Sequence, residues 1–98
     1  VKDFIESLEK RDKGKIFRIF QNIEHYGLLS ILPYVKRLTG TPFWEIRILG
    51  QNNIRIIYVS FTKESILVLH GFLKKTQKTP DRELEKAAAR FSDHKTRS

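Results

Sequence analysis

The chain has 98 residues, of which 40% are hydrophobic, with seven Phe, one Trp, no cysteine and a net charge of +8. This composition predicts one folded domain over residues 1–98, favours an anionic partner, and excludes a disulfide framework or a thiolate metal site. No apolar run approaches the roughly 20 residues of a membrane helix and no signal peptide is visible, so we expect a cytoplasmic protein without a membrane partner.

The chain is expected to open with two helices. Apolar residues recur there twice at helical spacing, first as Phe4, Ile5 and Leu8, then as Ile16, Phe17, Phe20 and Ile23. Asp12 is a suitable N-cap, Gly14 a break, and Gly27 suits the position after a helix end. We therefore predict helices over 2–10 and 13–26, packed as a hairpin with their apolar residues in the core.

Three β-rich runs follow a mixed segment, 28–42, in which prolines and glycine limit regular structure. The runs cover 44–49, 54–61 and 66–73, and the links between them are too short for parallel crossovers, so they predict an antiparallel meander. Alternation in the first run puts Trp44, Ile46 and Ile48 on one face and Glu45, Arg47 and Leu49 on the other. The middle run is apolar on both faces apart from Arg55, which indicates a central strand covered on both sides.

A last helix is expected after the strands. Thr79 suits its N-cap and Pro80 its first position, while an apolar stripe runs along it at Leu84, Ala87, Ala88 and Phe91. Residues 92–98 are polar and are expected to fray. The predicted fold is therefore α+β: two N-terminal helices on a small antiparallel sheet, followed by a C-terminal helix.

The excess positive charge lies in the second part of the chain. Residues 31–98 hold thirteen Lys and Arg against six Asp and Glu, whereas residues 1–30 hold six against five. The cations of the strands and of the segment after them are candidates for one phosphate-binding site, because fixed guanidinium and ammonium groups grip phosphate oxygens. These candidates are Arg47, Arg55, His70, Lys74 and Lys75, with Lys36, Arg37 and Lys78 as further RNA contacts.

Each candidate has an alternative role. Arg47 could pair in part with Glu45, Arg55 is either a buried cation or faces a cleft, and His70 is nearly as well explained as a core histidine. Lys74 and Lys75 could be ordinary surface charges, as could Lys36 and Arg37. Trp44 and Tyr58 are better explained as core than as stacking platforms for bases.

Metal and cofactor chemistry find little support, because the three histidines are far apart in sequence and neither an acidic cluster nor a glycine-rich phosphate loop accompanies them. We expect no metal and no cofactor. Metal-free cleavage of RNA remains open, since the 2′-hydroxyl can attack its own phosphate once it is aligned and charge and protons are managed. Composition alone leaves a nuclease and a passive RNA binder equally possible.

Several motifs resemble the RelE/HigB superfamily of bacterial toxins, specifically its phage-related branch. They are Leu38-Thr39-Gly40, Trp44-Glu45-Ile46-Arg47, Arg55-Ile56-Ile57-Tyr58 and the run from His70 through Lys74-Lys75 to Pro80. The resemblance covers nearly the whole chain. Similar toxins begin with a short strand before the first helix, so this resemblance implies either a fourth, N-terminal strand missing from the chain or a sheet of three strands with a bare edge.

The resemblance implies the toxin of a type II toxin–antitoxin pair: an mRNA interferase that cuts ribosome-bound mRNA without a metal and is held inactive by an antitoxin, often a helix-turn-helix protein. According to this interpretation, Arg47 and Arg55 hold the scissile phosphate and His70 transfers protons. The flanking RNA backbone is bound by Lys74, Lys75 and Lys78. One alternative is a non-catalytic RNA- or ribosome-binding module of the same fold. Another is a protein-binding domain whose basic face docks an acidic partner.

Overall fold

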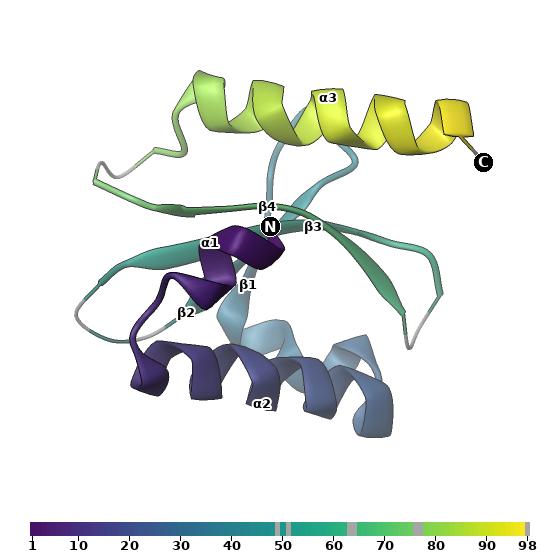
Figure 1. Cartoon of the computed structure of the whole chain (residues 1–98). Helices are drawn as coiled ribbons and strands as arrows, with labels where there is room; N and C mark the ends of the chain where they lie inside the picture. The colour runs from purple at the N-terminus through teal and green to yellow at the C-terminus, as the bar shows by residue number, and fades with distance from the viewer. Residues whose placement is uncertain (49, 51, 63–64, 76–77, 98) are drawn as a thin grey trace.

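The computed structural model describes every residue except 49, 51, 63, 64, 76, 77 and 98. It has the predicted α+β fold, in three layers: α1 and α2 cover one face of an antiparallel sheet and α3 covers the other (Figure 1). The elements follow in the order α1 (Lys2–Glu6), α2 (Lys10–Tyr26), the 3₁₀ helix η1 (Leu28–Tyr34), β1 (Val35–Arg37), β2 (Trp44–Ile48), β3 (Ile54–Ser60), β4 (Ile66–Leu73) and α3 (Asp81–Arg97).

The sheet has the strand order β1-β2-β3-β4, with every neighbouring pair antiparallel. The three predicted strands are present, but the sheet has a fourth strand that the sequence analysis missed. This strand is β1, which comes from within the chain at Val35–Arg37 and pairs with β2, rather than from a segment before the first helix. It was missed because three residues are too few for an alternating pattern, and because prolines and glycine surround them.

The N-terminal helices differ from the predicted pair in their boundaries. α1 ends at Glu6 and α2 begins at Lys10, so Gly14 lies inside α2 and Glu9, not Asp12, occupies the N-cap. Asp12 is instead buried and accepts a hydrogen bond from the Asn52 side chain at 2.7 Å. This contact ties the first turn of α2 to the segment between β2 and β3. Gly27 ends α2 as predicted, with a positive φ of 80° that favours glycine.

Two hydrophobic clusters lie on opposite faces of the sheet. On the α2 face, Ile16 and Ile23 pack against Trp44, Ile46, Ile48 and Ile54. On the α3 face, Ile57 and Val59 pack with Phe72 and Ala87. β3 is therefore covered on both sides, as predicted. Phe17 and Ala88, which the helical stripes had placed in the core, are exposed, because each lies at the margin of its stripe.

An irregularity in β4 decides which side chains face α3. His70 pairs with Ile57 and Val68 pairs with Tyr58, which leaves Leu69 without a partner in the register. Such a bulge lets two successive side chains face the same side, and both Leu69 and His70 contact α3 or its cluster.

The start and end of α3 also correct the sequence analysis. The carbonyl of Pro80 accepts the first helical bond, from Leu84 at 3.3 Å, so Pro80 rather than Thr79 is at the cap. The described residues of the predicted tail are helical as far as Arg97. Within the described chain, no helix combines the length and the apolar character needed to cross a bilayer.

Candidate functional site

Cations from three strands meet at one cavity on the α3 face of the sheet. Arg47 of β2 lies directly opposite Arg55 of β3 in the register, so their side chains leave the same face. Lys36 of β1 lies opposite Glu45 on that same face. The cavity has a volume of about 540 Å³, and we call it the cationic cavity; its lining is Lys36, Glu45, Arg47, Asn53, Arg55, Lys74 and Lys75.

A buried carboxylate organises the cationic cavity. Glu45 is fully buried, and its Oε1 lies 3.4 Å from Arg55 Nε and 3.6 Å from Lys74 Nζ. Its Oε2 accepts a hydrogen bond of 2.5 Å from the hydroxyl of Thr79. In the part of the chain that the structure describes, neither Glu45 Oε1 nor Arg55 Nε has a hydrogen-bond partner, so these contacts act through charge. Glu45 therefore holds two cations in place at the cavity, and Arg55 Nη1 also donates to the carbonyl of Ile54 at 3.1 Å.

The ion-pair partners of Glu45 among the described residues are Arg55 and Lys74. Arg47, whose partial pairing with Glu45 was considered as an alternative to phosphate binding, is not one of them. The role of Glu45 as the organiser of the site was not predicted from the sequence. One signal was present: an acid at a position whose neighbours in the strand are large and apolar, where an unpaired charge would be costly. Thr79 was likewise predicted to be a helix cap, whereas its hydroxyl donates a hydrogen bond to Glu45.

Backbone geometry fixes the lysines that follow β4. The amide of Lys74 donates to the carbonyl of Asn53 at 2.9 Å, which extends the pairing of β4 with β3 by one step. Asn53 has a positive φ of 47°, a conformation that asparagine tolerates better than most residues. The Lys74 side chain is thereby largely buried against Glu45, with 8% of it exposed, while Lys75, Lys36 and Arg47 are exposed at the rim.

The charge balance of the cationic cavity suits a phosphodiester. Five cations surround one carboxylate that has no solvent exposure, so the surface offered to a ligand is positive. Arginine and lysine at fixed positions can bind phosphate oxygens and offset charge that develops on them. The described lining contains no histidine, and among the described residues no group of acids and histidines could hold a metal ion.

His70 lies apart from the cationic cavity, although its side chain leaves the same face of the sheet. It lies on β4, four residues before Lys74, which is about 13 Å along a strand. The ring of Phe72 stacks against the ring of His70 and lies between His70 and Lys74. Its Nε2 lies 2.6 Å from Glu83 Oε1 and its Nδ1 lies 2.8 Å from Arg90 Nη1. We call these three residues the His70 clamp, because they join β4 to α3.

The hydrogen bonds of the clamp fix the protonation of His70. A guanidinium can only donate, so Nδ1 must accept from Arg90 and the proton must sit on Nε2, which donates to Glu83. Burial, followed by the charge of Arg90, lowers the pKa of His70 below 6.5 against the opposing effect of Glu83. Burial alone would raise the pKa of Glu83, but hydrogen bonds from His70 and Arg82 outweigh it and leave that pKa below 4.5. His70 is thus a neutral ring engaged at both nitrogens.

Two predicted RNA contacts lie outside the cationic cavity. Arg37 is on the opposite face from Lys36, and its Cζ lies over the ring of Trp44, 5.6 Å from the ring centroid. Its guanidinium also donates a hydrogen bond to the carbonyl of Thr41. Lys78 lines a separate hollow at the start of α3. The structure therefore gathers Lys36, Arg47, Arg55, Lys74 and Lys75, and leaves Arg37, Lys78 and His70 elsewhere.

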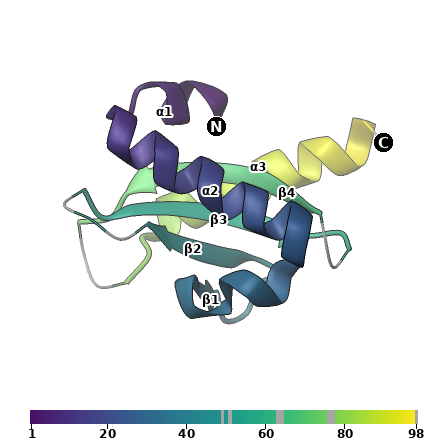
Figure 2. The same cartoon turned by 90° about the horizontal axis from the view of Figure 1, so that it is seen from below.

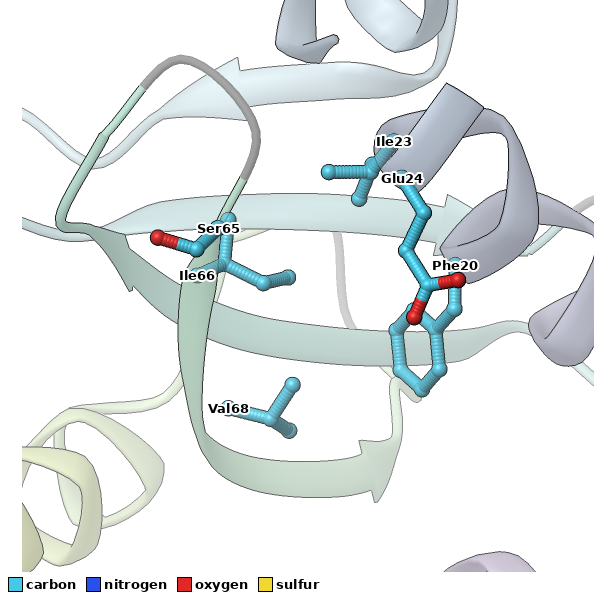
Figure 3. Close-up of a pocket in the computed structure, with 6 residues that line it drawn as sticks. All are labelled: Phe20, Ile23, Glu24, Ser65, Ile66 and Val68. Carbon is cyan, nitrogen blue, oxygen red and sulfur yellow. The ribbon is translucent and has the colours of Figure 1, made fainter. Parts of the chain in front are cut away.

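A further hollow lies between α2 and the beginning of β4, where side chains of both elements converge (Figure 3). Its volume is about 270 Å³, and it is lined by Phe20, Ile23, Glu24, Ser65, Ile66 and Val68. Among the described residues of this lining, the one ionisable group is the carboxylate of Glu24, which would repel a phosphate. This apolar hollow therefore lacks the charge of the cationic cavity and does not compete with it as an anion site.

Fold and site together define a small α+β domain built around a cationic cavity. A family model described as phage derived protein Gp49-like (DUF891) matches residues 3–92, which is most of the chain. The chain belongs to this family of toxin-like, phage-derived proteins. A comparison with curated proteins found no match.

Proposed function

We propose that this protein is the toxin of a type II toxin–antitoxin pair, a relative of the RelE/HigB toxins that cleaves mRNA on the ribosome in the cytoplasm without a metal. The observation that carries the proposal is the convergence of five cations on one cavity around a buried glutamate. Membership of a toxin-like phage-derived family agrees with it.

The proposed chemistry uses the RNA's own nucleophile. The 2′-oxygen of one nucleotide attacks the adjacent phosphorus, the bond to the 5′-oxygen of the next nucleotide breaks, and the proton lost from the 2′-hydroxyl is balanced by one gained at the leaving oxygen. Arg47 and Arg55 hold the phosphate and offset its developing charge. Lys36, Lys74 and Lys75 bind the flanking backbone, while Glu45 keeps Arg55 and Lys74 in position.

Dependence on the ribosome follows from what the described lining of the cationic cavity lacks. It provides charge but no histidine, and its carboxylate is buried. Alignment of the substrate by an outside partner can supply several kcal/mol of a barrier. We therefore expect the isolated protein to cut free RNA poorly and translated mRNA well.

A second candidate function is a non-catalytic RNA- or ribosome-binding module of the same fold. The specific observation in its favour is the His70 clamp, which occupies both ring nitrogens of the one histidine on the α3 face of the described sheet. A protein of this kind would bind RNA through the cationic cavity without breaking a bond.

Primer extension on one message, with and without ribosomes, separates these functions. Arg47→Ala is the most informative variant, because Arg47 is exposed and outside the ion pairs of Glu45. Loss of a group that stabilises transition-state charge lowers rates about 100-fold, and we expect that loss here. Arg11→Ala, an exposed cation of α2, is the matched control. Binding to ribosomes or RNA without any cleavage would support the second function instead.

The antitoxin is the remaining partner of the proposal. We expect expression of the toxin to arrest growth, and a co-expressed neighbouring gene, encoding a helix-turn-helix protein, to relieve the arrest. Arg47→Ala should remove the arrest while leaving the partner bound. Growth that continues at the normal rate with the folded wild-type protein present would contradict the toxin proposal.

A further inference from the structure

A second positively charged hollow lies on the other side of Arg47. It has a volume of about 240 Å³, and we call it the edge hollow; its lining is Lys15, Arg18, Ile19, Asn22, Tyr34, Arg47 and Ile48. Arg47 belongs to the linings of both the edge hollow and the cationic cavity. The two hollows therefore meet at one residue.

The length of β1 explains how Arg47 serves both hollows. β1 pairs with β2 only at residues 44–46, so the outer edge of β2 is left uncovered by β1 at Arg47 and Ile48. β1 lies at this border of the sheet and α2 passes across the strands beside it (Figure 2). A ligand strand can thus turn around the edge of β2, from the α3 face to the α2 face, while staying in contact with Arg47.

The residues of the edge hollow match the parts of a nucleotide. Ile19 and Ile48 give an apolar floor, and Tyr34, a residue at the end of η1 that is 37% exposed, offers an aromatic ring. Asn22 carries an amide that can both donate to and accept from the edge of a base. Arg18 and Lys15 add positive charge beside it. Base–aromatic stacking next to cations is a general mode of single-strand recognition.

The size of the edge hollow limits what it can hold. Sites for drug-sized ligands measure roughly 300–1,000 Å³, and this one is smaller, about 240 Å³. A hollow of this volume can hold one base more readily than a longer segment of RNA. The apolar hollow of Figure 3 is of similar volume but carries a carboxylate in place of the cations, so it does not suit the same ligand.

We propose that the edge hollow binds the nucleobase that flanks the phosphate held in the cationic cavity, stacked on Tyr34, with the RNA strand bent over the edge of β2 at Arg47. This inference rests on the proposed function, because it requires a single-stranded RNA in the cationic cavity. It adds a base-contacting site to a cavity that by itself contacts backbone, and it makes Tyr34 and Asn22 the residues that set any preference for the flanking base.

Fluorescence anisotropy with a short single-stranded RNA tests the proposal. The probe is about eight nucleotides long, within the range of single-strand sites, and carries 2′-O-methyl groups so that it is not cut. We expect Tyr34→Leu to weaken binding about tenfold, within the range of one stacked base, and Arg18→Gln to weaken it by several fold. The matched controls are Tyr26→Leu, which removes an aromatic ring that is 75% exposed, and Arg11→Gln; both should bind as the wild type does.

Abasic probes distinguish stacking from an indirect effect on the fold. A set of probes is prepared in which each probe lacks one base. We expect one of these probes to bind to the wild type and to Tyr34→Leu with equal affinity, because it lacks the base that stacks on Tyr34. A Tyr34→Leu penalty that is the same for every probe would overturn the proposal, as would a variant that binds like the wild type. Lys75→Ala, which removes an exposed cation of the cationic cavity, reports on that cavity. Weaker binding of Lys75→Ala with no effect of Tyr34→Leu or Arg18→Gln would refute the edge hollow alone. Unchanged binding of all three variants would refute the proposed function as well.

Discussion

The cationic cavity and the His70 clamp lie on the same face of one sheet, and each is organised by a buried glutamate. In the cavity, Glu45 faces more cations than it can neutralise, and three of these are exposed at the rim. In the clamp, Glu83 and Arg90 occupy both nitrogens of a neutral ring beneath α3. Cations also outnumber the acid in the clamp, because Arg82 and Lys86 pair with Glu83 as well, so charge alone does not distinguish the two clusters. Access does: the cations of the cavity line an open hollow, whereas the ring of His70 is buried and engaged at both nitrogens.

The largest expected effect concerns salt and the cationic cavity. If about four phosphates are neutralised, the logarithm of the RNA association constant should fall with the logarithm of salt concentration at a slope of about −3, from roughly −0.7 per contact on single strands. A tenfold rise in salt would then weaken binding about 1,000-fold. Titrations at several salt concentrations measure the slope. A slope near zero would mean that the cavity does not bind RNA through its charges.

The next largest effect is expected from Glu45→Gln. Removing the charge leaves Arg55 and Lys74 near a buried neutral group, and breaking a buried ion pair from one side costs about 3 kcal/mol. Urea denaturation should show this loss in the free energy of unfolding, with Glu85→Gln on the exposed face of α3 unchanged. A change no larger than that of the control would show that Glu45 does not organise the cavity.

His70→Ala is expected to have a smaller effect, and of a different kind. Loss of the hydrogen bonds to Glu83 and Arg90 should lower the free energy of unfolding by about 2 kcal/mol. RNA affinity and cleavage per folded molecule should stay at the wild-type level, because His70 lies apart from the cationic cavity. A fall in cleavage that matched that of Arg47→Ala, in protein shown to be folded, would return His70 to the proton-transfer role first predicted for it.

The smallest effect is expected from acidification of the clamp. The pKa of His70 is lowered in the folded state, so below about pH 6.5 the unfolded chain takes up a proton that the folded protein does not, and stability is lost as pH falls. The lowered pKa of Glu83 acts in the same direction at more acidic pH, since its stabilising charge is lost there. Urea titrations across this range should show the decline, and His70→Gln should remove the part due to the imidazole. Stability that rose on acidification would contradict the assignment of a neutral His70.

Local sequence patterns were enough for the fold class. Helical spacing of Ile16 and Ile23, alternation in β2 and the short links between strands depend on neighbours along the chain, and these features predicted the α+β arrangement. The alternation in β2, with the hairpin that follows it, also indicated that Arg47 and Arg55 belong to adjacent strands. β1 could not be predicted in this way. Its three residues are too few to show the alternation of a strand, and its pairing with β2 is a contact that local sequence does not reveal.

The roles of the glutamates were decided by tertiary structure. The residues next to Glu45 in the sequence do not indicate that Thr79 and Lys74, which follow β4, contact its carboxylate. The residues next to His70 likewise do not indicate that Glu83 and Arg90 of α3 bind its ring nitrogens. The bulge at Leu69 and the packing of α3 against β4 bring these groups together. The sequence alone therefore determined which residue types could carry the charge and placed Arg47 and Arg55 on neighbouring strands, but not Lys36 on β1. The tertiary structure decided which of them share a cavity, because the burial that pairs or separates charges exists only once the layers are packed.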